Sequence, residues 1–467
     1  MDRFLFVLGS NWKLSLAELD QCLRNKKFEG RILDYSANIA VVEFNSLHKN
    51  KYYVDKLEEM QYFLGGTQKI AEIYDFIDRK TLKDAFPQHM EKFRLVENSR
   101  KKILKIIEKF IDQIFPKIQN QEIFIANSIY PVFFDQNYYK KVLVQHFLPF
   151  LNKKITKICK EKGSKKAIYF KYPIENIKSG NLNPIFPHHV INYELLKENR
   201  AELIFGMTEE GVYIGRTYTV DDPNFKRKID EERPRTEFKS SISPKLAIMM
   251  LNFLNIFENR QDKKVLDPFI GNGTIALFAL IENFQVYGSD VDKQKVKDSK
   301  RNIEWLLREL GSPPIPYMDE KIKTLKVNRL SQEFKKGFFD GIVTEPDLGE
   351  FYTTEPYYTQ VSNEIENTLK PLYNNLFREA YQVLKPKARI CLVAPSISVL
   401  DDKKDIRLNI VGIANQFKFK MIPLISSNRI VNKSNERLQF RKEEIYSILD
   451  AKNGQVVKRK IYVFEKN

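Results

Sequence analysis

The chain has 467 residues, which is too long for a single hydrophobic core and indicates about three domains. Its hydrophobic share of 43% and aromatic share of 12% exclude a wholly disordered chain, and no apolar run approaches the roughly 18 residues of a membrane span. The 77 basic and 60 acidic residues give a net charge of +17, which favours a polyanionic partner such as nucleic acid; a lysine-rich composition that only adds solubility is the alternative.

The first 78 residues predict a small α/β domain. The segments RFLFVLG and ANIAVVEF have the pattern of strands, and LSLAELDQCL between them has the pattern of an amphipathic helix begun by Ser15. Gly65 and Gly66 predict a turn before a further strand in TQKIAEIYDF. An acid at residue 2 and the lack of a small-residue cleavage site favour a first strand over a signal peptide.

Residues 79–190 predict a second α/β domain with a basic surface. Helical spacing in VENSRKKILKIIEKFIDQIF and KKVLVQHFLPFLNKKITKICKEKG alternates with the strand patterns QEIFIANSIYPVFF and KAIYFKYP. Residues 151–178 contain nine lysines and two glutamates, and Tyr169, Phe170 and Tyr172 lie near the end of this stretch. Cations beside aromatic rings suit a surface that binds phosphates and stacks bases, whereas the alternative is a solvated helix followed by a buried strand. The candidate RNA-binding residues are Lys153, Lys154, Lys157, Lys165, Lys166 and Lys171.

Residues 191–240 are expected to be a linker. They begin with a helix and a short hairpin, ELIFGMTEEGVYIGRTYTV, whose turn is Glu210-Gly211. The charged stretch DDPNFKRKIDEERPRTEFKSS then leads into the last domain.

Residues 241–467 predict a largely parallel sheet covered by helices on both faces. The helix SISPKLAIMMLNFLNIF is capped by Ser243, and the strands KKVLD, QVYGSDVD, FFDGIVTEP, ARICLVAP, FKMIPLI and KIYVFEK follow in an alternation with helices. The segment EEIYSILDAKNGQVVKRKIYVFEK adds an antiparallel hairpin at one edge. The fold class is therefore α/β, with a Rossmann-like C-terminal domain.

The loop in VLDPFIGNGT predicts the binding site of S-adenosylmethionine. Ligands of such sheets bind beyond the carboxyl ends of the strands, where this loop falls. Gly271 and Gly273 let the backbone pass close to a cofactor, Asp267 precedes them, and Asp290 ends the next strand, where a carboxylate accepts ribose hydroxyls. The third glycine of G-x-G-x-x-G is missing, which argues against a nicotinamide cofactor; a tight turn in another α/β protein is the alternative.

The segment FFDGIVTEPDLG occupies the place of the catalytic loop of amino-group methyltransferases. In that class the strand ends in [D/N]-P-P-[Y/F/W], where an acceptor side chain and a carbonyl orient an exocyclic amine and a ring stacks on the base. The catalytic candidates here are Glu345, Pro346 and Asp347, and Phe351 or Tyr352 could provide the ring. The alternative is a turn whose acids are merely solvated.

These motifs together resemble the THUMP-containing tRNA guanosine N2-methyltransferases, which modify guanosine 10. The similarity extends over nearly the whole chain, through LGGTQKIAEI, YIGRTYTVDD, ERPR, SPKLA, LDPFIGNGT, YGSDVD and VTEP-x-LG. It implies a ferredoxin-like domain in residues 1–78, a THUMP domain in 79–190 that holds the tRNA, and a class I methyltransferase domain in 241–467. It also implies S-adenosylmethionine as cofactor and tRNA as substrate; a small zinc-binding activator subunit accompanies some relatives. The three cysteines are far apart in the sequence, which argues against a disulfide framework and fits a reducing cytoplasm.

The resemblance assigns roles to individual residues. Those implied to line the cofactor are Asp267, Phe269, Gly271, Asn272, Gly273, Thr274, Asp290, Val291 and Asn328. Glu345 would face both the cofactor and the guanine amine. Three positions depart from the family pattern: E-P-D-L-G replaces D-P-P-Y-G, Asn272 replaces a smaller residue, and Asn328 replaces an aspartate.

Two other functions stay open from the sequence. The E-P-D-L-G departure fits a tRNA-binding protein that no longer methylates, and an amino-methyltransferase acting on ribosomal RNA or DNA uses the same cofactor loop. No catalytic metal is expected, because Cys22, Cys159 and Cys391 are far apart and the pair His188-His189 has no cysteine near it.

Overall fold

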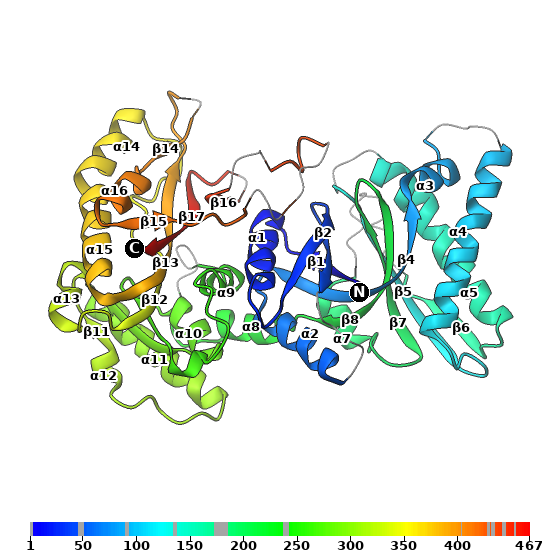
Figure 1. The fold of residues 1–467 in the computed structure, drawn as a ribbon, viewed down its shortest axis with the longest axis horizontal. Helices are drawn as coiled ribbons and strands as arrows, with labels where there is room; N and C mark the ends of the chain where they lie inside the picture. The colour runs from blue at the N-terminus through cyan, green and yellow to red at the C-terminus, as the bar shows by residue number, and fades with distance from the viewer. Residues whose placement is uncertain are drawn as a thin grey trace.

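The computed structural model describes residues 3–44, 51–88, 93–133, 138–171, 185–236, 242–402, 404–426, 430, 435–440, 445–452 and 454–467, without the side chains of 51–55 and 139–141. These residues form two sheets, one of eight strands in the N-terminal half and one of nine in the C-terminal half. Figure 1 shows the two halves side by side along the long axis of the molecule.

The N-terminal sheet has the strand order β2-β3-β1-β4-β8-β7-β5-β6. Its strands are β1 Arg3–Leu8, β2 Gly30–Tyr35, β3 Ile39–Phe44, β4 Thr67–Asp78, β5 Glu122–Tyr130, β6 Lys166–Tyr169, β7 Arg200–Met207 and β8 Gly211–Val220. Its helices are α1 Trp12–Leu23, α2 Lys51–Phe63, α3 Arg79–Ala85, α4 Phe93–Ile114, the π-helix η1 Tyr139–Phe147, α5 Leu148–Glu161, α7 Pro187–Asn192 and α8 Pro223–Glu231. The first four strands, joined through α1 and α2, have the ferredoxin-like order.

The expected linker at 191–240 is wrong for residues 200–220. The hairpin β7–β8 pairs on one side with β4 and on the other with β5, so it lies in the middle of the sheet. Both faces of the hairpin are covered, so its residues alternate little between apolar and polar. No local pattern therefore indicated that the hairpin belongs to a larger sheet. The irregular stretch that follows also contains a helix, α8, capped by Asp222.

A buried ion pair crosses this sheet. Lys69 on β4 contacts Glu202 on β7 at 2.5 Å, and both side chains are fully buried. The hydroxyls of Ser128 and Thr217 each donate to the Glu202 carboxylate at 2.5 Å. Because a buried charge without partners is strongly unfavourable, these contacts fix the register of β4, β5, β7 and β8 relative to one another.

The C-terminal sheet has the order β11-β10-β9-β12-β13-β17-β15, with β14 beside β13 and β16 beside β17. Its strands are β9 Lys264–Asp267, β10 Gln285–Asp290, β11 Ile322–Thr324, β12 Phe339–Thr344, β13 Leu384–Ile397, β14 Ile406–Arg407, β15 Phe419–Met421, β16 Ser447–Asp450 and β17 Val457–Lys466. Its helices are α9 Pro244–Asn252, η2 Arg260–Asp262, α10 Thr274–Ile281, α11 Lys293–Glu309, α12 Met318–Lys321, η3 Val327–Arg329, α13 Leu330–Glu333, α14 Tyr358–Glu364, η4 Ile365–Leu369, α15 Lys370–Val383 and α16 Ile410–Gln416.

Five strands of this sheet are parallel, and β17 runs antiparallel to β13 and β15. When the strands are numbered within the domain without the short side strands β14 and β16, the order is 3-2-1-4-5-7-6, the arrangement of Rossmann-like methyltransferases. The order of the strands reverses between β9 and β12, so a ligand site is expected beyond their carboxyl ends. The predicted fold class and the closing hairpin β16–β17 are confirmed.

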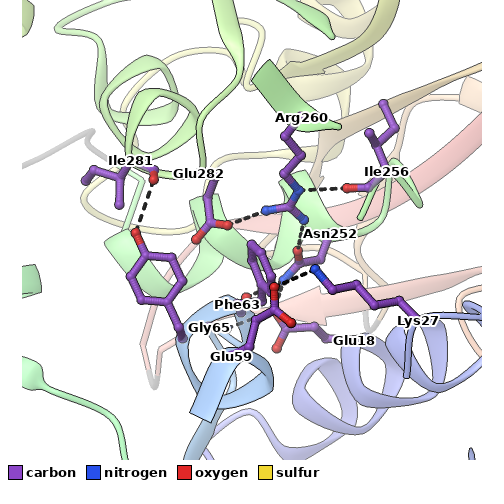
Figure 2. Close-up of polar contacts among 11 residues, drawn as sticks. Glu18, Lys27, Glu59, Phe63, Gly65, Asn252, Ile256, Arg260, Ile281 and Glu282 are labelled. Atoms are coloured by element: carbon purple, nitrogen blue, oxygen red, sulfur yellow. Dashed lines mark hydrogen bonds and ion pairs between the residues drawn. The ribbon is translucent and has the colours of Figure 1, made fainter. Parts of the chain in front are cut away.

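The two halves share one hydrophobic core. A single cluster of buried side chains contains Phe4 and Leu14 of the N-terminal half together with Met250 and Val265 of the C-terminal half. Polar groups are buried in the same contact (Figure 2). The Glu18 carboxylate accepts hydrogen bonds from the N–H groups of Gly65 and Gly66 at 2.9 and 2.8 Å and from the Asn252 side chain at 2.7 Å.

Arg260 completes this joint from the C-terminal side (Figure 2). Its guanidinium donates to Asn252 Oδ1 at 2.9 Å and to the Ile256 carbonyl at 2.8 Å, forms an ion pair with Glu282, and lies 4.4 Å from the centre of the Phe63 ring. Every donor and acceptor in this network is directional, so the halves are held in a defined orientation.

Candidate functional site

The loop between β9 and α10 has the backbone that the sequence predicted. Gly271 and Gly273 have φ values of +50° and +84°. A Cβ on Gly273 would lie 3.2 Å from the Ser299 Cβ, so both the conformation and the space require glycine there. The Gly271 N–H donates to Asp290 Oδ2 at 3.0 Å, which ties the loop to the end of β10.

Asp267 is a buried acid directly beneath this loop. Its Oδ1 accepts from the Thr344 hydroxyl at 2.7 Å and from the Phe269 N–H at 3.2 Å. Burial raises the pKa of Asp267 to about 7; the two hydrogen bonds oppose this, and the charges of Asp290 and Glu345 add to it. Residues from the ends of β9, β10 and β12 therefore bring three carboxylates to one place.

This concentration of negative charge has a chemical meaning. Acids placed together disfavour a phosphate-bearing ligand and favour a cationic one, which argues against a pyrophosphate cofactor in the loop. S-adenosylmethionine carries a sulfonium and an ammonium group, so its charge suits the site. The residues present therefore fit this cofactor.

Asp290 is oriented by the backbone around it. Its second oxygen, Oδ1, accepts from the Asp292 N–H at 3.0 Å, and each carboxylate oxygen retains a lone pair for a ligand hydroxyl. The next residue, Val291, is 63% exposed and offers an apolar surface beside it. Asn328 lies exposed in η3, shortly beyond Thr324, the cross-strand neighbour of Asp290.

The segment ERPR packs against the same loop, which sequence reasoning missed. The guanidinium of Arg233, whose side chain is buried, donates to the Thr274 hydroxyl at 2.8 Å. Asn302 of α11 donates to the carbonyls of Asn272 and Arg235, both at 2.8 Å. The ERPR motif is one of the segments that carry the family resemblance. Its partners are remote in sequence, so its contact with the cofactor loop could not be inferred.

Glu345 follows β12 and is held by an arginine from β17. Its Oε1 accepts from Arg459 Nε at 2.5 Å. Burial raises the pKa of Glu345, and Arg459 opposes that rise. Pro346 is buried, whereas Asp347 is exposed and caps the turn by accepting from the Gly349 N–H at 3.0 Å. Of the three catalytic candidates, the structure brings Glu345 to the other carboxylates.

The two rings proposed for stacking have different surroundings. Phe351 is 72% exposed, whereas the Tyr352 hydroxyl donates to Glu364 Oε2 at 2.8 Å and its ring is half-buried. Phe351 can therefore turn towards a base without breaking a hydrogen bond. This difference favours Phe351 as the stacking ring.

The lysines predicted to bind RNA lie on α5, at the start of β6 and on either side of β6, at the other end of the molecule from β12 (Figure 1). All are exposed except Lys154, which is half-buried. Lys157 and Lys165 form loose ion pairs with Glu161 and Glu122, at 3.4 and 3.8 Å. Two of the aromatic residues predicted to stack on bases have other outcomes. Phe170 packs against Tyr193 with ring centres 5.2 Å apart, and Tyr172 lies outside the described residues.

Within the described part of the chain, no cluster of three or more histidine, cysteine or acidic side chains could hold a metal ion. His188 and His189 belong to α7, and their rings are 4.0 Å apart. Among the described helices, none has the length and apolar character of a membrane span.

The fold and the loop define a class, the Rossmann-like methyltransferase domain. In comparisons with known proteins, no family model matches the chain. It is 27% identical over 188 residues to a tRNA (guanine(10)-N2)-dimethyltransferase of Methanothermobacter thermautotrophicus, covering 40% of this chain and 48% of that protein. It is 26% identical over 208 residues to the enzyme of the same name from Pyrococcus abyssi, covering 43% and 55%.

These matches confirm the sequence resemblance over 40% and 43% of the chain, and the chain spans about half the length of the curated relatives it matches. Among solved structures, TrmN from Thermus thermophilus aligns over 100% of both chains with 13% identity and a TM-score of 0.48. A putative methyltransferase complexed with SAH aligns over 100% of this chain and 99% of that chain, with 11% identity and a TM-score of 0.45.

Proposed function

We propose that this protein transfers a methyl group from S-adenosylmethionine to the exocyclic N2 of a guanosine in tRNA, at position 10. The observation that carries the proposal is the convergence of Asp267, Asp290 and Glu345 around a glycine loop at the carboxyl edge of the C-terminal sheet. Its similarity to two tRNA (guanine(10)-N2)-dimethyltransferases supports the choice of acceptor.

Each group in the site has a role in this reaction. S-adenosylmethionine, when bound, supplies an electrophilic methyl group. Asp267 holds the loop through Phe269 and β12 through Thr344, and Asp290 offers lone pairs to ribose hydroxyls. The Glu345 carboxylate accepts an N–H of the guanine amine, which turns the nitrogen lone pair to the methyl group, and Phe351 covers the base. The nitrogen that gains the methyl group loses one proton, which the Glu345 carboxylate would accept, and the sulfonium would leave as a neutral thioether.

The other predicted site residues divide into those that bind the cofactor and those that bind the tRNA. Phe269, Gly271, Asn272, Gly273, Thr274, Val291 and Asn328 line the cofactor, and the lysines of α5 and β6 hold the tRNA within a THUMP domain. Cys22, Cys159 and Cys391 are free and buried thiols, which suits the cytoplasm. We also propose a zinc-binding activator subunit as a partner. Affinity purification from source cells followed by zinc analysis tests for it.

The test uses labelled S-adenosylmethionine and an unmodified tRNA transcript, followed by nucleoside analysis. The expected product is labelled N2-methylguanosine or N2,N2-dimethylguanosine. Glu345→Ala should lower the rate by about a hundredfold or more while cofactor binding by calorimetry changes little. Label in DNA or ribosomal RNA alone, or in no nucleic acid, would contradict the proposal.

A second function, tRNA binding without methylation, is favoured by one observation. Arg459 already occupies one oxygen of Glu345, the group that the amine requires. Tight, salt-sensitive tRNA binding together with undetectable cofactor binding would select this alternative.

A further inference from the structure

Arg459 reaches Glu345 from the middle of a three-strand segment. On β17 it lies opposite Pro395 of β13 and opposite Asp450 of β16. Its Nε is 2.5 Å from Glu345 Oε1 and its Nη2 is 3.5 Å from Oε2. The two side chains are 18% and 15% exposed, so the ion pair is largely removed from solvent.

The hairpin that carries Arg459 is fastened to the N-terminal half. The Asn11 side chain donates to the Leu449 carbonyl and to Asp450 Oδ1, both at 3.0 Å. Asn11 is also the N-cap of α1 and accepts from the Leu14 N–H. Asp450 and Arg459 are cross-strand neighbours, so a continuous series of residues joins the start of α1 to the catalytic loop.

We infer that Arg459 is a positioning residue for amine methylation, fixing the Glu345 carboxylate as an ionised hydrogen-bond acceptor, and that Asn11 anchors the hairpin which sets its aim. This inference rests on the proposed function and adds a residue that the sequence did not single out. The extra methylene of glutamate, compared with the usual aspartate, adds a rotatable bond, and the ion pair removes that freedom.

A purely structural role explains the ion pair less well. A buried ion pair often stabilises a fold no more than apolar residues of similar volume would, so stability alone gives little reason for its presence. A carboxylate has about four lone-pair positions, and the close Arg459 contact occupies one, which leaves acceptors for an amine. A protonated Glu345 would keep its carbonyl oxygen as an acceptor but lose the negative charge, so its hydrogen bond with the amine would be weaker and its hydroxyl could no longer accept as strongly.

The charges around Glu345 make its ionisation depend on Arg459. Burial and the negative charge of Asp450 raise the pKa of Glu345, while Arg459 lowers it. Asp267 and the Tyr373 hydroxyl also face this carboxylate, and its charge raises the pKa of each of them. The Arg459 guanidinium contacts the carboxylate directly, so its removal shifts the balance towards the protonated acid.

The experiment compares Arg459→Met and Arg459→Lys with the matched control Lys458→Met, using the full chain. Lys458 is the adjacent residue on β17 and pairs with Asp405 at 2.9 Å, not with Glu345. Arg459→Met should lower kcat at neutral pH by about tenfold or more, leave KM for the cofactor near its wild-type value, and move the acidic limb of kcat upward by about one pH unit or more. Arg459→Lys should be intermediate, and Lys458→Met should keep the wild-type profile.

Asn11 is tested by Asn11→Ser, which keeps a helix cap and loses the reach to the hairpin, and by Asn11→Asp, which keeps the cap and places a like charge beside Asp450. Both should lower kcat for tRNA methylation, Asn11→Asp more strongly. A pH profile and kcat unchanged in Arg459→Met would overturn the inference while leaving the function intact.

Failure of the proposed function is recognised separately, because the wild-type chain would then label no tRNA. In that event the ion pair is judged by a double-mutant cycle in urea unfolding with Glu345→Gln and Arg459→Met. If the two substitutions lower the free energy of unfolding additively, the inferred ion pair is overturned. A strong coupling energy between them would support it.

Discussion

Asp267 determines how the stability of the cofactor-free protein depends on pH. Its pKa of about 7 in the folded state exceeds its ordinary value of 3.8, so the folded chain binds the proton more tightly than the unfolded chain does. The contribution of Asp267 to stability therefore falls as the pH rises from about 4 to about 7, and it is lost in full above pH 7. Glu18 and Glu282, whose pKa values are also raised to about 7 by burial, act with the same sign.

The prediction at this residue is that Asp267→Asn reduces the decline in unfolding free energy between pH 4 and pH 7 by up to about 4 kcal/mol. The amide has no charge to bury and its oxygen still accepts from Thr344. Urea unfolding at a series of pH values measures the effect, with Asp292→Asn as the exposed control. A slope identical to that of the wild type would contradict the assigned pKa.

At the scale of elements, the β9–α10 loop depends on its two glycines to different extents. Gly273 combines a φ of +84° with a neighbour 3.2 Å from any added Cβ, whereas Gly271 has a φ of +50° and its nearest neighbour at 4.0 Å. Gly273→Ala should therefore destabilise the fold by about 2 kcal/mol and weaken cofactor binding. Gly271→Ala should cost about 1 kcal/mol or less. Chemical denaturation and calorimetry check the order, and an equal effect of the two substitutions would contradict it.

Local patterns predicted the elements that local chemistry determines. The Ser243 cap, the strand–loop–helix around Gly271 and the acid at the end of β10 follow from residues close in sequence, and the structure has each of them. The start of α1 was predicted at Ser15, but Asn11 is the cap, because both residue types can cap and the tertiary contact with Asp450 selects one of them.

Pairings between distant residues could not be predicted. The pairing of Ile70 on β4 with Thr219 on β8 merges the first domain and the expected linker into one sheet, and no local pattern specifies it. The same holds for Arg459 beside Glu345 and for Arg233 beside Thr274. The site was therefore predicted as a loop and two acids, while the residues that orient them became known from the fold.

At the scale of the whole molecule, Glu18 joins the two halves. Its removal would leave the Gly65 and Gly66 N–H groups and the Asn252 amide buried without this acceptor. Glu18→Ala should destabilise the protein by about 3 kcal/mol and separate the unfolding of the halves into two transitions. Glu59→Ala is the control at the same joint, because Glu59 forms a partly exposed ion pair with Lys27 and should cost less than about 1 kcal/mol (Figure 2). Calorimetry distinguishes them, and a single unshifted transition in Glu18→Ala would contradict this role.

Under the proposed function, the substrate must be long enough to contact both the lysine surface and the loop that carries Glu345, because the two lie far apart (Figure 1). We expect Lys153→Glu combined with Lys157→Glu to weaken tRNA binding by about tenfold or more and to flatten its dependence on salt. Lys335→Glu with Lys336→Glu, also exposed but in the C-terminal half, should have little effect. Filter binding across a salt series measures both, and equal losses in the two variants would mean that the charge acts without a defined surface.

Mass-spectrometric mapping of tRNA from cells with and without this protein is the decisive measurement for the proposed methylation of guanine N2. We predict that N2-methylated guanosine disappears from position 10 in the cells that lack it and returns with the wild-type chain but not with Glu345→Ala. An unchanged map, or the loss of a different modification, would contradict the proposed function.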